Sequence, residues 1–78
     1  MYRVMPITIK LFASLRRGRF DVKEWGYVPG LTCNRIIHDI GIPEKEVRLI
    51  FVNGRHASLE DQLADGDTLA LFPPIGGG

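Results

Sequence analysis

The sequence is poor in cysteine, in long apolar runs and in net charge, and each shortage excludes a class of protein. Cys33 is the only cysteine in 78 residues, so no internal disulfide can form, and a reducing, cytoplasmic setting is expected. No run of about 18 apolar residues occurs, so we expect no membrane span. The segment Met1–Pro6 lacks the apolar stretch of a secretory signal. The net charge of +1 gives no reason to expect a polyanionic partner.

Few side chains are suited to metal binding or catalysis. His38 and His56 are the only histidines and lack cysteine or carboxylate neighbours at metal-site spacing, so we expect surface histidines and no metal. Ser14 and Ser58 lack the histidine and acid partners of a nucleophilic serine. The arginines at 16, 17 and 19 are interpreted as a solvated loop or a patch for an acidic protein, because no nucleic-acid motif accompanies them.

The first third of the chain predicts two strands. Ile7, Ile9 and Leu11 alternate with other side chains, which is typical of a strand with one face in the core. A polar connection is expected over 13–18. A second strand lies within Phe20–Val28, where the apolar parity changes near Lys23 and predicts a bulge or break.

One short helix follows a Pro-Gly turn. Thr32 is the predicted N-cap, because its hydroxyl can accept from a free N–H of the first turn. Gly41 fits the left-handed position after the helix, and Pro43 prevents continuation. The apolar residues between them recur at helical spacing on one face: Cys33, Ile36, Ile37 and Ile40. Cys33 is therefore expected to be a small buried side chain and not a reactive thiol.

The second half of the chain predicts further strands separated by tight turns. Val47–Val52 alternates as a third strand, and Asn53-Gly54 is a strong signal for a two-residue hairpin. A short return strand is expected over Arg55–Ala57. Ser58–Leu63 predicts a brief capped helical turn, and Asp65–Asp67 is a second tight turn because Gly66 lies at its centre.

The element order predicts an α+β domain. One helix packs on a mixed sheet of four or five strands, with the first and last strands parallel and adjacent at the centre. This arrangement is the ubiquitin-like β-grasp, and residues 1–78 form one domain.

The last residues are the candidate functional segment. Thr68–Phe72 reads as a strand that Pro73-Pro74 ends, and residues 73–78 are expected to form an extended mobile tail. Glycines at its end suit delivery of a backbone carboxylate into a narrow partner site. Phe72 shares strand parity with Ala70, so its ring either anchors a partner groove or packs at the core edge. Ile50 and Val52 are expected to extend an apolar patch on the open face of the sheet.

Several segments resemble the MoaD/ThiS family of ubiquitin-like sulfur carriers, most closely the small subunit of molybdopterin synthase or its tungstopterin-pathway relatives. The resemblance covers nearly the whole chain and rests on these segments: Ile9–Ala13, Gly30-x-Thr32, Asn53-Gly54-Arg55, Leu63-x-Asp65-Gly66-Asp67 and Leu71–Gly78. The chain departs from the family pattern in Trp25-Gly26, in the arginine cluster and in the additional Gly76.

The resemblance implies a function for Gly78. An E1-like adenylyltransferase would use ATP and magnesium to form an acyl-adenylate there, and a sulfur donor protein would convert it to a thiocarboxylate. The large subunit of molybdopterin synthase would receive the sulfur. The chain would be a carrier, monomeric when free, with no resident cofactor and with catalysis left to its partners. The residues expected to bind those partners are Phe72, Pro73, Pro74, Ile75, Gly76 and Gly77.

Other functions fit the same tail. A protein modifier would pass its activated Gly78 to a lysine amine, and the acyl-adenylate serves either nucleophile. A thiamin-pathway carrier is a second alternative, and an ordinary β-grasp interaction domain is a third. The sequence also leaves open whether Gly78 is the encoded end or is exposed by cleavage.

Overall fold

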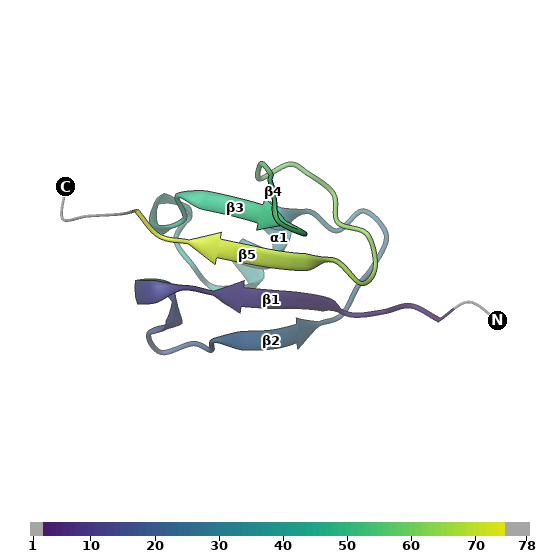
Figure 1. Ribbon diagram of the computed structural model, residues 1–78, viewed down its shortest axis with the longest axis horizontal. Helices are drawn as coiled ribbons and strands as arrows, with labels where there is room; N and C mark the ends of the chain where they lie inside the picture. The colour runs from purple at the N-terminus through teal and green to yellow at the C-terminus, as the bar shows by residue number, and fades with distance from the viewer. Residues whose placement is uncertain (1–2, 75–78) are drawn as a thin grey trace.

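The computed structural model describes residues 3–74. Its elements pack as one helix against one face of a mixed sheet (Figure 1). In chain order they are β1 (Ile7–Leu11), the 3₁₀ helix η1 (Ala13–Arg16), β2 (Val22–Trp25), α1 (Cys33–Ile40), the 3₁₀ helix η2 (Glu44–Glu46), β3 (Leu49–Val52), β4 (Arg55–His56) and β5 (Thr68–Phe72).

The sheet has five strands in the order β2-β1-β5-β3-β4. β1 and β5 run parallel, with Ile9 opposite Leu69, and the other neighbours are antiparallel. β5 therefore lies between β1 and β3 and is held by ladders on both sides. The predicted α+β class, the ubiquitin-like β-grasp and the central parallel pair are confirmed.

β2 differs from its prediction because it contains no bulge. Its pairing with β1 is regular from Lys10 opposite Val22 to Ile7 opposite Trp25. The apparent change of parity arises because Val22 lies on the outward side of the strand, where it is exposed, and Phe20 precedes the strand. The core-facing side of β2 thus carries Lys23 and Trp25, and the Lys23 ammonium lies over the rings of Phe20 and Trp25.

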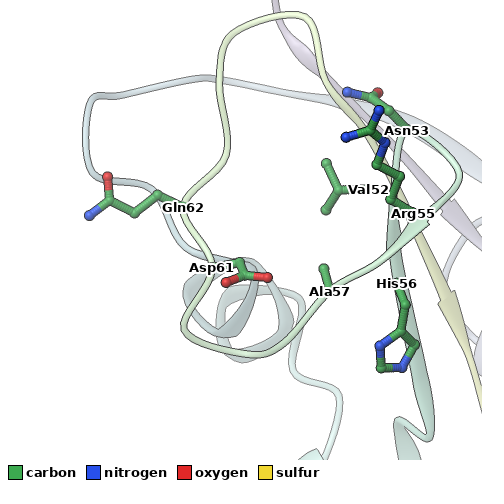
Figure 2. Close-up of a pocket in the computed structure, with 7 residues that line it drawn as sticks. All are labelled: Val52, Asn53, Arg55, His56, Ala57, Asp61 and Gln62. Atoms are coloured by element: carbon green, nitrogen blue, oxygen red, sulfur yellow. The ribbon is translucent and has the colours of Figure 1, made fainter.

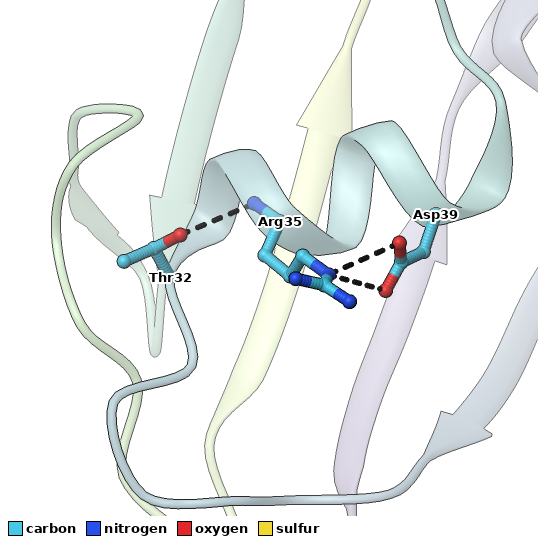
Figure 3. A network of polar contacts seen from close by, with 3 residues as sticks. All are labelled: Thr32, Arg35 and Asp39. Atoms are coloured by element: carbon cyan, nitrogen blue, oxygen red, sulfur yellow. Dashed lines mark hydrogen bonds and ion pairs between the residues drawn. The ribbon is translucent and has the colours of Figure 1, made fainter.

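Helix α1 begins and ends as its sequence predicts. The Thr32 hydroxyl accepts from the Arg35 N–H at 3.1 Å, and Gly41 adopts a left-handed conformation with φ of 90°. On the outer face, Arg35 donates to both carboxylate oxygens of Asp39 (Figure 3). Cys33, Ile36 and Ile37 are buried on the opposite face, where they cover the sheet.

The core joins the inner faces of α1 and the sheet. Its fully buried side chains include Ile7, Ile9, Leu11, Leu69 and Leu71, which confirms the predicted inner face of both central strands. Leu15 is also fully buried, so the expected polar connection over 13–18 is corrected: η1 turns one leucine into the core. Within the described residues, no helix is long and apolar enough to cross a membrane.

The turns of the second half also follow the sequence with one exception. Asn53 and Gly54 both have positive φ, at 52° and 81°, as a type I′ hairpin turn requires. The segment after β4 forms a hydrogen-bonded turn in place of the expected helical turn. Ser58 and Asp61 close it reciprocally, through the Asp61 N–H to the Ser58 carbonyl and the Ser58 N–H to the Asp61 carboxylate.

Candidate functional site

The end of β5 is fixed to its neighbours up to the last residue of the strand. The Arg48 N–H donates to the Phe72 carbonyl at 2.8 Å, and the Phe12 N–H donates to the Leu71 carbonyl at 3.2 Å. Pro73 is buried and Pro74 is exposed, so the chain leaves the packed body between the two prolines. Of the predicted tail, Ile75, Gly76, Gly77 and Gly78 lie outside the described residues.

The Phe72 ring lies on the face of the sheet that α1 leaves open. It stacks on the Phe12 ring with 4.3 Å between centroids and an interplanar angle of 9°. It also meets the Phe51 ring edge to face at 5.7 Å. Phe72 is half-buried by these neighbours. Its ring is therefore held in one orientation while part of it stays accessible.

The expected contribution of Ile50 and Val52 to this open face is wrong. Ile50 pairs with Leu71 and Val52 with Leu69, and directly paired residues share a face, so both point toward the core. The residue between them, Phe51, points to the open face instead. β3 is apolar on both parities, so alternation alone does not decide which face is inside.

Four rings form a continuous row across the open face, which we call the aromatic row: Phe12, Phe72, Phe51 and His56. His56 meets the Phe51 ring edge to face at 5.7 Å, as its direct partner on β4. The Arg16 guanidinium lies 5.5 Å from the Phe12 centroid and closes the other end. Of these four residues, the sequence analysis identified only Phe72. Phe12 could also have been found, because it has the same strand parity as Lys10 and so lies on the face opposite the core residues Ile9 and Leu11.

The aromatic row borders the place where the chain leaves the sheet. Phe12 directly follows β1, Phe72 is the last residue of β5, and both strands run toward that end. Stacked and edge-to-face rings are favourable pairs that fix one another in place. The arrangement therefore presents a preformed apolar surface beside the end of β5, and such surfaces are typical of docking sites.

Cys33 is unsuited to carry sulfur. Its side chain is fully buried among the core residues, as predicted. Burial raises the pKa of the Cys33 thiol from 9.0 to about 11, with smaller contributions from the charges of Asp61 and Asp67. The thiolate is the reactive form of cysteine, so this group is inert at neutral pH.

A hollow of about 540 Å³ lies between the β3–β4 hairpin and the turn that follows it (Figure 2). Its polar side chains are largely occupied: the Asn53 amide bonds to Asp67, and the Asp61 carboxylate bonds to the Ser58 N–H. Arg55 lines it from the hairpin and Gln62 from the opposite segment, with the Gln62 amide directed away from the hairpin. The hollow contains none of the predicted site residues and brings together no nucleophile with a base.

The described residues offer no other catalytic or metal-binding arrangement. Within 3–74, no three of the histidine, cysteine, aspartate and glutamate side chains gather into a group that could hold a metal ion. His38 and His56 are exposed on different elements, as predicted for surface histidines. What the described residues provide is a packed domain with an apolar row of rings beside the last residue of β5.

Residues 9–78 match the model of the ThiS family. No curated protein matches the sequence. Among solved structures, a Pyrococcus furiosus protein assigned as molybdopterin converting factor, subunit 1 is 30% identical, over 91% of this chain and 99% of its own, with a TM-score of 0.71.

Two more distant structures share the fold. Small archaeal modifier protein 1 of Haloferax volcanii is 24% identical over 91% of this chain and 99% of its own, with a TM-score of 0.71. A complex of subunits 1 and 2 of molybdopterin-converting factor from Helicobacter pylori contains a chain that is 18% identical, over 95% of this chain and 100% of its own, with a TM-score of 0.61.

Proposed function

This chain belongs to the ThiS family of ubiquitin-like sulfur carriers, and from that premise we propose that its Gly78 carries sulfur as a thiocarboxylate for the synthesis of molybdopterin. The observation that carries the proposal is the extent of the family match, which reaches Gly78 and so includes the whole glycine tail. The fixed end of β5 supports it, because a carrier needs a rigid body from which its reactive end emerges.

The chemistry begins with activation of the Gly78 carboxylate. A terminal carboxylate is anionic at neutral pH and resists attack by nucleophiles. An E1-like adenylyltransferase would use ATP and magnesium to convert it to an acyl-adenylate with release of pyrophosphate. A persulfide on a sulfur donor protein would then displace AMP, and a thiol would cleave the resulting sulfur–sulfur bond. The products are the thiocarboxylate and a disulfide, so the thiol supplies the two electrons.

Glycine at the end of the tail fits this chemistry. The activating site has to approach the acyl carbon closely, and a Cβ at position 78 would obstruct the nucleotide and the sulfur donor. Glycine can also adopt backbone angles that other residues avoid, which would suit positions 76 and 77 to a narrow partner site. Pro73 and Pro74 restrict the chain before it, which reduces the conformational entropy lost when a partner binds the tail.

The aromatic row is the proposed docking surface for the partners of this tail. Ordering a glycine-rich segment costs free energy, which a separate contact has to offset. Phe72 belongs to the row and directly precedes the tail, so a partner that contacts its ring is aligned with the following residues. The Helicobacter pylori complex joins subunits 1 and 2 of molybdopterin-converting factor. We propose a corresponding large subunit as one partner and the adenylyltransferase as another.

The molybdopterin pathway is preferred because the 30% identical relative is assigned to it. A protein modifier is the second candidate, supported by the similarity to small archaeal modifier protein 1. Its activated Gly78 would acylate a lysine amine in place of a sulfur. A thiamin-pathway carrier would share every step up to the thiocarboxylate and differ only in the acceptor.

Intact-mass spectrometry tests the proposal. The full chain is incubated with an E1-like adenylyltransferase, ATP, magnesium and a persulfide donor. The expected product is heavier by the exchange of one oxygen for one sulfur, and fragmentation places that change on Gly78. A chain lacking Gly77 and Gly78 is the matched control and should gain no mass.

The same reaction distinguishes the alternatives. Ladders of conjugates on a denaturing gel, with no sulfur-bearing product, would favour the modifier. A sulfur-bearing chain that restores thiamin synthesis but not molybdopterin synthesis in deletion strains would overturn the pathway assignment. Unchanged cellular function after deletion of Gly77 and Gly78 would contradict the carrier role itself.

A further inference from the structure

A second surface lies on the opposite side of the sheet from the aromatic row. Two adjoining hollows of about 370 and 340 Å³ separate β2 and its flanking loops from helix α1, and they share Trp25 and Asp39. We call this surface the β2–α1 groove. Its charged and aromatic lining residues are Arg19, Phe20, Lys23, Trp25, Arg35 and Asp39.

β2 is an edge strand whose outer backbone groups are open. The Leu11 N–H bonds to the Asp21 carbonyl, so by antiparallel alternation the groups of Lys23 and Trp25 also face β1. The N–H and C=O groups of Val22 and Glu24 therefore point outward. Within residues 3–74 no other backbone group bonds to them. An edge of this kind can accept one more strand.

The groove beside this edge is aromatic and mainly cationic. The Lys23 ammonium lies 5.6 Å from the Phe20 centroid and 5.7 Å from the Trp25 centroid. None of the described carboxylates pairs with Lys23. The Arg19 guanidinium is held by a hydrogen bond to the Leu15 carbonyl at 3.1 Å. The one acidic lining residue, Asp39, is already paired with Arg35 (Figure 3).

We propose that the β2–α1 groove binds an extended, apolar segment of a partner protein that carries acidic residues next to its apolar run. The segment adds a strand to the outer edge of β2 through Val22 and Glu24. Its apolar side chains contact Phe20 and Trp25, and its carboxylates meet Lys23 and Arg19. Backbone hydrogen bonds give such a complex its affinity, and the alternate side-chain contacts give it selectivity.

Other occupants fit the groove less well. A second copy of this chain, paired β2 to β2, would bring the unpaired Lys23 and the nearby arginines of both copies together. Single-stranded RNA would use the cations and rings but would leave the outward N–H and C=O groups of Val22 and Glu24 without a strand partner. An acidic protein segment uses the edge, the rings and the charge together.

Titration of the full ¹⁵N-labelled chain with a short synthetic peptide tests the proposal. The peptide has a run of valine and isoleucine followed by a run of aspartates, and its matched control has lysines in place of the aspartates. The expected result is saturable amide shifts over 22–25 and 35–39 and at the Trp25 indole. The shifts should be absent from Phe51 and Phe72, and the lysine peptide should bind at least about tenfold more weakly.

Two variants separate charge from backbone pairing. Lys23→Glu should weaken binding by about tenfold or more, whereas Lys45→Glu, an exposed reversal on η2, should not. Val22→Pro removes an outward N–H at an edge position that tolerates proline, and it should abolish binding while the thermal midpoint stays close to that of the parent. Both groove variants should still load sulfur on Gly78, so failure here is distinct from failure of the proposed carrier role.

Several results would overturn the proposal. The acidic peptide could cause no saturable shifts, or its shifts could centre on Phe51 and Phe72. The acidic and lysine peptides could also bind equally well. Concentration-dependent shifts over 22–25 without peptide would indicate self-association instead. Tighter binding of a short oligouridylate than of the acidic peptide would assign the groove to nucleic acid.

Discussion

Asn53 and Asp67 are joined side chain to side chain, with the Asn53 Nδ2 donating to the Asp67 Oδ1 at 2.9 Å. The same amide accepts from the Thr68 N–H at 2.9 Å, and the other Asp67 oxygen accepts from the Ala64 N–H at 2.8 Å. These bonds lock the β3–β4 turn to the turn before β5. β5 is thereby fixed at its first residue, while Arg48 fixes it at its last.

This cross-link predicts that Asn53→Ala is destabilising. The change removes two side-chain hydrogen bonds and places alanine at a φ of 52°, and together these should lower the free energy of unfolding by about 2 kcal/mol. Thermal unfolding should show a midpoint lower by roughly 10 °C. Asn53→Gly is the control, because it loses the same hydrogen bonds but relieves the backbone strain. Its thermal midpoint should fall less than that of Asn53→Ala. Parent-like midpoints for both variants would contradict the role of the cross-link.

Gly78→Ala should impair adenylation and leave the fold intact. The added methyl group would obstruct the approach of the acyl carbon to the nucleotide. The buried core of the described residues lies between Ile7 and Leu71, so we expect it to stay intact. Pyrophosphate release by the activating enzyme should fall while the thermal midpoint stays unchanged. Gly26→Ala is the control, because a Cβ there meets no atom within 4 Å and needs no positive φ. Equal turnover of Gly78→Ala and the parent would contradict the proposed steric demand.

Phe72→Ala should weaken binding to the activating enzyme and to the large subunit. It removes the ring that joins the aromatic row to the tail, and loss of such an anchor costs about tenfold or more in affinity. The loss of stability should be smaller, about 1–2 kcal/mol, because the ring is only half-buried. Calorimetric titration measures the affinity, with Val28→Ala as an exposed apolar truncation away from the row. Unchanged affinity would show that the partners bind elsewhere.

Because the Cys33 thiol is buried, we expect the folded chain to lose stability at alkaline pH. The folded chain raises the pKa of this thiol from 9.0 to about 11, so the unfolded chain releases the proton first. Its contribution to stability is complete below pH 9.0 and falls by about 1.4 kcal/mol for each pH unit up to the folded pKa of about 11.

Denaturant unfolding from pH 8 to 11 measures this dependence against Cys33→Ala. The variant should lose the part of the slope that the thiol causes, since the other titrating groups are common to both chains. It should also still accept sulfur at Gly78. Identical slopes for the two chains, or failure of the variant to load sulfur, would contradict the buried and inert state of Cys33.

Elements with strong local signals follow from the amino-acid sequence alone. Thr32 and Gly41 set the ends of α1 through a side-chain cap and a left-handed backbone, and Asn53-Gly54 and Gly66 set the turns through positive φ. Strict alternation in β1 and β5 fixed their inner faces, because only one parity of each strand is consistently aliphatic. These features, with the glycine tail, were enough for the fold and for the family.

The residues that meet on each face of the sheet depend on how the strands pair, which local patterns do not specify. β3 is apolar on both parities, and its pairing with β5 chose Ile50 for the core and Phe51 for the aromatic row. β2 places Lys23 and Trp25 on its inner side because its register follows β1, although its own sequence suggested a bulge. A local pattern reports how often apolar residues recur, but a neighbouring strand determines which of two possible faces is buried.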